Sequence, residues 1–401
     1  MEKALDGLRV LEVAHAWAGP LTGMYLADMG AEVIKIEKPG VGDLQRSPIA
    51  HGPAAEGENV VFLFINRNKK GITLDLTNSK GQEIFKEMVE KADIVVENFI
   101  PGTMDRWGLN YEVLSKINPR LIMVSVSGFG QTGPYREHGA FDLVAQALSG
   151  LMSVTGYPDQ PPVRAGSAIA DHLGGLFGFC GALIALYWRK KSGQGQWVDS
   201  SLMDSTVLTL GDRFVRYAYF GHSELISQVG NRYPWMGRAG SYATKDGYLT
   251  FRTATESGPA TLAKIVGRED LITGDEGADF MATYSLLQGE LGDELEKFLK
   301  DKTNSEALKI LDEAGIACAP VLSIDEVIED PQFKEREMFV DVEHPKLGKM
   351  KMMGIVPKLS KTPGSVECAG PMLGQHNEEV YSSLMGYSKE DISRLKEEKL
   401  I

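Results

Sequence analysis

The stretch GITLDLTNSKGQEIFKEMVEKADIVVENF, residues 71–99, contains one complete strand–helix–strand unit. Its first segment, 71–76, and its last segment, 93–99, are short and rich in apolar and β-branched residues, which predicts buried strands. Residues 81–92 carry apolar side chains at the spacing of an amphipathic helix, and Thr77 or Asn78 can cap its start. Two strands joined by a helix in this way pair in parallel through a right-handed crossover.

The same alternation extends outward from this unit. Strands are predicted at 9–13, 31–37 and 121–129, and helices at 18–30 and 110–118. Repeated units of this kind place helices against a parallel, buried sheet. The predicted fold class is therefore α/β.

The pattern changes near residue 225. The sequence LISQVGNRYPWMGRAG, residues 225–240, is rich in turn-forming residues and predicts a linker. After it, residues 240–254 predict a hairpin with Asp246 and Gly247 at its turn, and helical stretches follow. The expected organisation is a large domain at 1–225, a smaller domain at 226–330 and a C-terminal segment at 331–401 that returns to the large domain.

Composition restricts the class of protein. The chain has 401 residues, of which 43% are hydrophobic and 24% charged, as in an ordinary soluble globular protein. A net charge of −13 argues against binding nucleic acid, which requires a basic surface. The three cysteines and seven histidines are scattered without metal-ligand spacing, which predicts reduced thiols, no metal site and a cytoplasmic location.

The apolar run LGGLFGFCGALIALYW, residues 173–188, follows directly after Asp171 and His172. It is shorter than the ~20 residues that a bilayer requires, and so we expect a buried core helix and no membrane span. Asp171 lies at the start of this helix, where a carboxylate can accept hydrogen bonds from free backbone N–H groups. His172 is expected to cap or pack. A helix cap is therefore one interpretation of Asp171.

A second interpretation of Asp171 depends on its neighbours, which are small. A cap needs no open space, whereas these residues predict space around the acid. A carboxylate with a reference pKa of ~4 is already ionised at pH 7 and can attack an activated acyl group without a base. Both interpretations stay open from the residues alone. The small neighbours are Ala165, Gly166, Ala168, Ala170, Gly174, Gly175 and Gly178.

Further residues suggest a nucleotide site. Glu37 ends a predicted strand where a dinucleotide-binding fold places its ribose-binding acid, and Lys38 beside it suits a phosphorylated nucleotide. The first strand–helix turn, HAWAGPLTG at 15–23, has glycines but no GxGxxG pattern, which counts against a nicotinamide-dependent oxidoreductase. The stretch NRNKKG, residues 66–71, concentrates three cations that form either a phosphate site or a solvated loop.

Ordered blocks along nearly the whole chain resemble the class III CoA-transferases, the CaiB/BaiF family. The resemblance implies a Rossmann-like large domain with a parallel sheet, a smaller α+β domain and two chains interlocked as a homodimer. The blocks are LDGLRVLEVAHAWAGP, GAEVIKIEKPGVGD, NRNKKGITLDL, ADIVVENFIPGTMDRWG, INPRLIMVSVSGFG, AGSAIADHLGG, SGQGQWVDSSLMD and CAPVLSIDEVIEDPQF.

The resemblance also implies the chemistry. Asp171 would attack an acyl-CoA thioester, and CoA would pass to a free carboxylic acid through aspartyl anhydride and aspartyl-CoA thioester intermediates. The CoA thioester is then a substrate, and no permanently bound cofactor is expected. Independently of the resemblance, the cations Arg67, Lys69 and Lys70 are assigned to the nucleotide phosphates. The implied CoA contacts are Trp17, Ala18, Lys38, Leu74, Asp75, Asn98, Phe99, Arg106, Gly139, Ala140, Phe141 and Asp142.

Three competing functions stay open. The first is that of the 2-methylacyl-CoA racemases of the same superfamily, which pair the same aspartate with a histidine. Here Phe141 occupies the histidine position while Asp142 is retained, and without a second base two-sided proton transfer fails, which favours the transferase. The second is the nicotinamide-dependent oxidoreductase. The third is a non-catalytic CoA-binding protein, which would leave the small residues around Asp171 unexplained.

Overall fold

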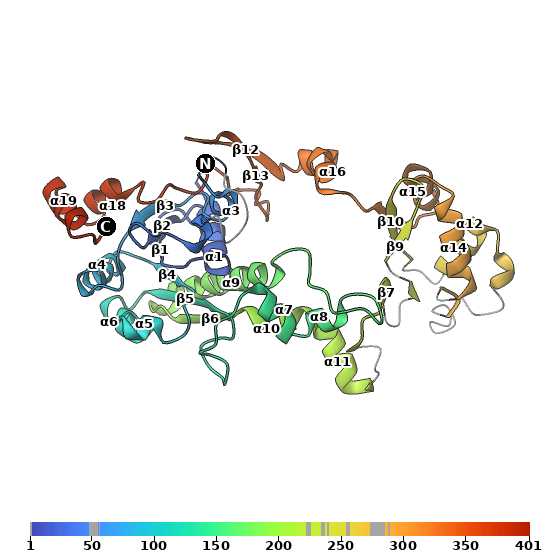
Figure 1. Ribbon diagram of the computed structural model, residues 1–401, viewed down its shortest axis with the longest axis horizontal. Coiled ribbons are helices and arrows are strands. Elements are labelled where there is room, and N and C mark those ends of the chain that lie inside the picture. Colours follow the sequence, from blue (N-terminus) through green and yellow to red (C-terminus); the bar gives the residue numbers. More distant parts are fainter. Residues whose placement is uncertain are drawn as a thin grey trace. The chain divides into compact units, whose positions relative to one another are not determined.

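A computed structural model describes residues 2–47, 55, 57–221, 226–233, 237–238, 240–253, 257–272, 285–287 and 289–401. The chain divides into two compact units (Figure 1). The first unit spans Met1–Leu151, Ala165–Leu210 and Pro331–Ile401, and the second spans Met152–Arg164 and Gly211–Asp330.

The first unit is built on a six-stranded sheet with the strand order β3-β2-β1-β4-β5-β6. All neighbouring strands pair in parallel, which confirms the predicted α/β fold with a parallel sheet. The order reverses between β1 and β4, and open α/β sheets bind ligands beyond the carboxyl ends of strands at such a point. The strands are β1 (Arg9–Glu12), β2 (Glu32–Glu37), β3 (Lys70–Thr73), β4 (Ile94–Glu97), β5 (Ile122–Ser127) and β6 (Trp197–Ser201).

Apolar side chains of the strands alternate between two cores, one on each face of the sheet. Val10 and Val33 belong to the core that α1, α9 and α10 cover, whereas Leu11 and Ile34 belong to the core beneath α4, α6, α18 and α19. This alternation is the period-two pattern of a strand buried on both faces. The helices are α1 (Ala18–Asp28), α4 (Ser79–Val89), α6 (Tyr111–Ile117), α9 (Ile169–Ser192), α10 (Leu202–Thr209), α18 (Asn377–Ser383) and α19 (Lys389–Glu397).

Helix α9 is the apolar helix that the sequence predicts. In the described part of the chain, it alone is long and apolar enough to cross a membrane by length and composition. Ala182 and Ala185 are fully buried, but Ile184 and Tyr187 are 68% and 62% exposed. The core helix expected here is therefore buried on one face only, because a helix that covers a sheet buries one face and leaves the other free.

The C-terminal residues complete the first unit. The hairpin of β12 (Phe339–His344) and β13 (Gly348–Met353) packs against α3 (Val60–Ile65). Near the chain end, the Tyr381 hydroxyl donates to the Thr73 carbonyl oxygen at 2.7 Å, and the Asp75 N–H donates to the Leu400 carbonyl oxygen at 2.9 Å. The remaining elements of this unit are η1 (Leu44–Arg46), α5 (Thr103–Arg106), α7 (Asp142–Leu148) and α17 (Pro331–Glu335).

The second unit contains an antiparallel sheet with the order β11-β10-β9 and a separate apolar core. Strands β9 and β10 form the hairpin predicted at 240–254, and the Thr244 N–H donates to the Gly247 carbonyl oxygen across its turn at 3.0 Å. The elements are α11 (Gly211–Phe220), β7 (Arg232–Tyr233), β8 (Gly237–Arg238), β9 (Ser241–Ala243), β10 (Tyr248–Arg252), α12 (Gly258–Val266), η3 (Glu269–Leu271), α14 (Glu290–Lys300), α15 (Asn304–Glu313), β11 (Ala317–Pro320) and α16 (Ile324–Glu329), and the short α8 (Leu151–Val154) lies at the boundary between the units.

Candidate active site

The start of α9 is capped by Asp142, not by Asp171. Asp142 begins α7, and its Oδ1 accepts hydrogen bonds from the backbone N–H groups of Ala170 at 2.8 Å and Asp171 at 3.4 Å. Gln146 fixes the second oxygen of Asp142, because its Nε2 donates to Oδ2 at 2.6 Å. The interpretation of Asp171 as a helix cap is therefore wrong, since a neighbouring acid already satisfies these N–H groups.

The Asp171 side chain is consequently unengaged. Among the residues that the structure describes, none donates a hydrogen bond or forms an ion pair with its partly buried carboxylate. Burial, and then the negative charge of Asp142, raise the pKa of Asp171 to about 7. A carboxyl group in this state can be ionised near neutral pH and has free lone pairs, which are the requirements for a nucleophile.

The glycines of α9 serve packing. A Cβ on Gly175 would meet the Ala18 carbonyl oxygen at 2.7 Å, and on Gly174 and Gly178 it would meet side chains at 2.9 and 2.7 Å. These glycines therefore let α9 approach its neighbours closely, and the expectation that they leave open space around Asp171 was wrong. Gly166 does border open space, because a Cβ there would meet no atom within 4 Å.

Trp17 and Ala18 lie at the start of α1, next to the start of α9. The Trp17 ring contacts the His172 ring edge-on, with a distance of 5.9 Å between the ring centres. This contact confirms that His172 packs. It also places Trp17 beside the residue that follows Asp171, which brings together three of the predicted site residues.

A second group of predicted residues lines a pocket of about 280 Å³ beyond the ends of β1–β4. The pocket lies where the strand order reverses, as expected for a ligand site in such a sheet. Lys38, Leu74, Asp75 and Phe99 were predicted from the sequence. His15, Asp43, Thr77 and Trp107 were missed.

The remaining residues predicted to contact CoA either form hydrogen bonds within the protein or are exposed to solvent. Both polar groups of the Asn98 amide bind the backbone of His15, since Nδ2 donates to its carbonyl oxygen at 2.6 Å and Oδ1 accepts from its N–H at 2.8 Å. Arg106 is exposed and donates to the Thr103 hydroxyl at 2.9 Å. Gly139, Ala140 and Phe141 precede α7, and Phe141 is 68% exposed. Their contact with CoA stays a prediction.

The basic stretch 66–71 is not a phosphate site. Arg67 is buried and forms an ion pair with Asp28, with 2.7 Å between Nη2 and Oδ2. Lys69 is buried against Glu12, and the partly buried Lys70 forms ion pairs with acids of its own. The phosphate assignment was wrong because acids distant in the sequence neutralise these cations inside the fold.

Glu37 is likewise engaged within the protein. Its two oxygens accept hydrogen bonds from Arg46 Nε and Nη2 at 2.7 and 2.8 Å, and one also accepts from the Asp43 N–H. It therefore does not offer a free carboxylate to a ribose, which counts further against the oxidoreductase. Within the described ranges no group of three or more His, Cys, Asp or Glu could hold a metal ion.

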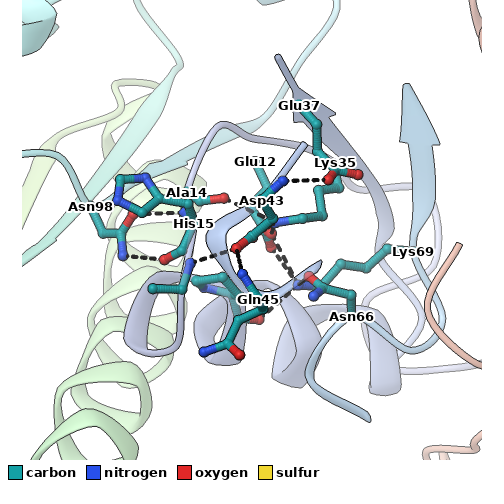
Figure 2. Close-up of polar contacts among 12 residues, drawn as sticks. Glu12, Ala14, His15, Lys35, Glu37, Asp43, Gln45, Asn66, Lys69 and Asn98 are labelled. Atoms are coloured by element: carbon teal, nitrogen blue, oxygen red, sulfur yellow. Dashed lines mark hydrogen bonds and ion pairs between the residues drawn. The ribbon is translucent and has the colours of Figure 1, made fainter. Parts of the chain in front are cut away.

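Figure 2 shows a buried polar cluster composed of Glu12, Lys35, Asp43, Asn66 and Lys69, of which Asp43 also lines the pocket. Glu12 lies between Lys69 Nζ at 2.8 Å and Lys35 Nζ at 3.2 Å. Burial, with the nearby Lys35 charge, lowers the pKa of Lys69 to about 8. In the sequence, Glu12 and Lys35 of this cluster appear only as polar residues within the apolar strands RVLEV and EVIKIE, and this signal could have indicated their ion pair.

Comparison with known proteins identifies the family. Residues 5–377 match the family model described as CoA-transferase family III. The chain belongs to CoA-transferase family III. The predicted enzyme class, an acyl-CoA:carboxylate CoA-transferase that uses CoA thioesters as substrates, is confirmed at this level.

Relatives within the family cover almost the entire chain. The chain is 38% identical to succinyl-CoA–D-citramalate CoA-transferase of Chloroflexus aurantiacus, with 100% of this chain and 98% of that protein covered. It is 34% identical to formyl-CoA:oxalate CoA-transferase of Rhodopseudomonas palustris, covering 98% and 96%. The crystal structure of a CaiB/BaiF family protein from Brucella suis superposes with a TM-score of 0.83 at 32% identity, covering 96% of this chain and 100% of that one.

Proposed function

We propose that this enzyme transfers CoA from an acyl-CoA thioester to a free carboxylic acid through covalent intermediates on Asp171. The observation that carries the proposal is the unengaged carboxylate of Asp171, whose capping role Asp142 has taken. An architectural acid at this position would use its oxygens within the fold. Asp171 instead keeps them available to a thioester carbonyl.

The reaction consists of four acyl exchanges at Asp171. An Asp171 oxygen attacks the thioester carbonyl carbon, the C–S bond breaks, and CoA leaves as a thiolate from a mixed anhydride. The thiolate attacks the Asp171 carbonyl of that anhydride, which gives an aspartyl-CoA thioester and releases the donor as its carboxylate. The acceptor carboxylate displaces CoA thiolate from this thioester, and the thiolate then takes the acceptor acyl group and restores the Asp171 carboxylate. No net proton transfer is required.

In this proposal the two ends of acyl-CoA bind at two different places in the enzyme. The nucleotide part of CoA occupies the pocket lined by Lys38, Leu74, Asp75 and Phe99, where Lys38 supplies a cation for phosphate. The thioester end reaches Trp17 and Asp171. Support comes from the position of the pocket at the sheet's switch point.

Trapping the covalent intermediate tests the proposal. The enzyme is incubated with acyl-CoA alone and then with hydroxylamine or borohydride, and peptides covering residues 165–180 are mapped by mass spectrometry. We expect modification at Asp171 and none in Asp171→Asn. The Asp142→Asn variant is the matched control, because its amide oxygen can still cap α9 while Asp171 is intact. Turnover by an enzyme whose 165–180 peptide stays unmodified would contradict the covalent scheme.

The acids exchanged are, in this proposal, small dicarboxylic acids. Support comes from the names of the relatives, which include transferases for citramalate, malate, oxalate and glutarate. Succinyl-CoA assayed against a panel of these acceptors, with monocarboxylic acids of equal length as controls, tests it. A preference for the monocarboxylic acids would reject the dicarboxylate assignment.

The racemase gains no support from the structure. Phe141 occupies the position of the racemase histidine, and a phenyl ring cannot carry a proton. Wash-in of solvent deuterium at the α-carbon of a 2-methylacyl-CoA, without any acceptor acid, would be the sign of racemase activity. We expect none.

The interlocked homodimer also belongs to the proposal. It is supported by apolar side chains that each unit leaves exposed, such as Ile184 and Tyr187 of α9 and, in the second unit, Val215 and Tyr219 of α11. Where such exposed apolar side chains form a contiguous patch, the patch marks an interaction site. Light scattering should give twice the mass of the chain, and a monomer at assay concentrations would contradict the dimer. The cytoplasmic location stays a prediction.

A further inference from the structure

The segment that joins β1 to α1 has an unfavourable backbone conformation at one residue. Ala16, between His15 and Trp17, has a φ of 64°, in the left-handed region that residues with a Cβ disfavour. Such a conformation persists only where neighbouring groups hold it in place. Trp17 is the next residue and contacts His172, so the conformation of Ala16 sets the direction in which the backbone enters Trp17.

Three side chains from separate elements hold this segment (Figure 2). The Asn98 amide clamps the backbone of His15 through the two hydrogen bonds of its side chain. Lys35 Nζ donates to the Ala14 carbonyl oxygen at 3.0 Å. Asp43 Oδ1 accepts the hydrogen bond from the Ala16 N–H at 2.9 Å, which is the contact at the left-handed residue itself.

Asp43 is suited to this task because both of its oxygens are engaged. Oδ1 also accepts from the Gln45 N–H at 2.9 Å, and Oδ2 lies 2.8 Å from Lys35 Nζ. Burial opposes ionisation of Asp43, but Lys35 and the hydrogen bonds from Gln45 and Ala16 hold the pKa of this carboxyl below its usual value. Its side chain is therefore a fixed anion to which the segment is attached.

We propose that Asp43 is a positioning residue that holds Ala16 in its left-handed conformation and thereby sets Trp17 beside Asp171. The inference rests on the proposed role of Asp171 as the nucleophile. Asp43 also lines the pocket assigned to the CoA nucleotide, so one side chain borders both the pocket and the segment that reaches the reacting carboxylate. A displacement of about 1 Å in such a segment can slow a reaction ~100-fold.

The test compares two buried Asp→Asn substitutions. Asp43→Asn keeps the size of the side chain but removes the charge that binds Lys35, which loosens the anchor of Ala16. We expect kcat to fall about 10-fold or more while KM for acyl-CoA changes by less than ~3-fold, because positioning acts on the reacting geometry. The emission contributed by Trp17, obtained by difference from Trp17→Phe, should also change.

The matched control is Asp28→Asn. Asp28 is as buried as Asp43 and forms an ion pair with Arg67, but the hydrogen-bond partners of its carboxylate lie outside residues 14–17. We expect it to lower stability while kcat of the folded enzyme stays unchanged. If Asp43→Asn leaves kcat unchanged, or lowers it no more than Asp28→Asn does, the positioning role is wrong.

Hydrogen exchange on the unaltered enzyme keeps the inference testable if Asp43→Asn does not fold. The Ala16 amide, resolved by mass spectrometry with backbone fragmentation, should be strongly protected from exchange. Rapid exchange at Ala16 would overturn the proposal. Failure of the covalent scheme is distinguishable, because in that case the unaltered enzyme forms no Asp171 adduct, whereas a failed positioning role leaves the adduct forming at the same rate in Asp43→Asn.

Discussion

Glu12 and Asp171 are two carboxylates of the first unit that are shielded from solvent to different degrees. Glu12 has cations as its neighbours, whereas Asp171 has an acid. Glu12 is fully buried and lies between the ammonium groups of Lys35 and Lys69. Asp171 is partly buried, has no cation or hydrogen-bond donor among the described residues, and has another acid, Asp142, as its charged neighbour. The fold thus neutralises the acid that it uses for architecture and leaves uncompensated the acid proposed for chemistry, as expected where burial shifts a functional pKa.

The largest expected effect is on activity at the uncompensated acid. Asp171→Asn should reduce the rate of CoA transfer by at least ~10⁴-fold, because the amide cannot form the acyl intermediates. Initial rates with one donor–acceptor pair measure it. Asp28→Asn serves as the folded control that keeps its activity. If the rate of CoA transfer falls by less than ~10-fold, Asp171 is not the nucleophile, and its role is structural like that of Glu12.

The contrast also predicts that substitutions of Glu12 and Asp171 change the free energy of unfolding in opposite directions. Glu12→Gln leaves Lys69 buried without its anion and should lower the free energy of unfolding by about 3–5 kcal/mol. Asp171→Asn should raise it by roughly 1–3 kcal/mol at pH 8. A carboxyl whose folded pKa is raised to about 7 binds its proton more tightly in the folded state, so the folded state loses stability as pH rises from about 4 through 7.

Urea unfolding at pH 8 and at pH 4 measures both substitutions. The stabilisation by Asp171→Asn should be present at pH 8 and nearly absent at pH 4, where the folded carboxyl is protonated and the unfolded one is about half protonated. If Asp171→Asn instead lowers the free energy of unfolding at pH 8 as much as Glu12→Gln does, cations or hydrogen-bond donors stabilise the Asp171 carboxylate as well, and the contrast is wrong.

The packing around Asp171 gives a smaller effect. Gly175→Ala should lower the free energy of unfolding by about 1–3 kcal/mol, because the new methyl would lie 2.7 Å from the Ala18 carbonyl oxygen and 2.8 Å from Leu21 Cβ. Gly166→Ala, at a position with open space, should change it by less than ~0.5 kcal/mol. Thermal unfolding of the pair checks this. Equal effects would mean that the helix contact can relax.

The smallest expected effect is a shift in pH dependence. The rate of Asp171 acylation should rise with pH around an apparent pKa of about 7, since the ionised carboxylate is the nucleophile. Asp142→Asn should move this midpoint down by about half a unit to one unit, because a negative neighbour is lost while a capping oxygen remains. Single-turnover rates from pH 5 to 9 measure it, and an upward shift would contradict the assigned cause.

Local sequence patterns were sufficient to predict the parallel sheet. The strands are short and rich in apolar and β-branched residues, and the helices between them have amphipathic spacing, as in residues 71–99. These patterns depend on each segment's own residues. The 240–254 hairpin was predictable for the same reason, since Asp246 and Gly247 suit its turn.

The site was predictable only in part, because its polar contacts join residues that are distant in the sequence. Arg67 looked like a free cation, since its partner Asp28 lies on another element. The capping role went to Asp142 instead of Asp171 because α7 lies against the start of α9, which no local pattern reveals. Asp43 could have been suspected from its place in the GVGD block, but its hydrogen bond to Ala16 depends on the folded loop.

The bond between Asp75 and Leu400 bears on how the enzyme is made. Asp75 borders the pocket, yet its N–H is satisfied by a carbonyl more than three hundred positions later. During translation this hydrogen bond can form only when residue 400 has emerged from the ribosome, after the whole second unit has been synthesised. A growing chain therefore lacks this hydrogen bond at the edge of the pocket for most of its synthesis.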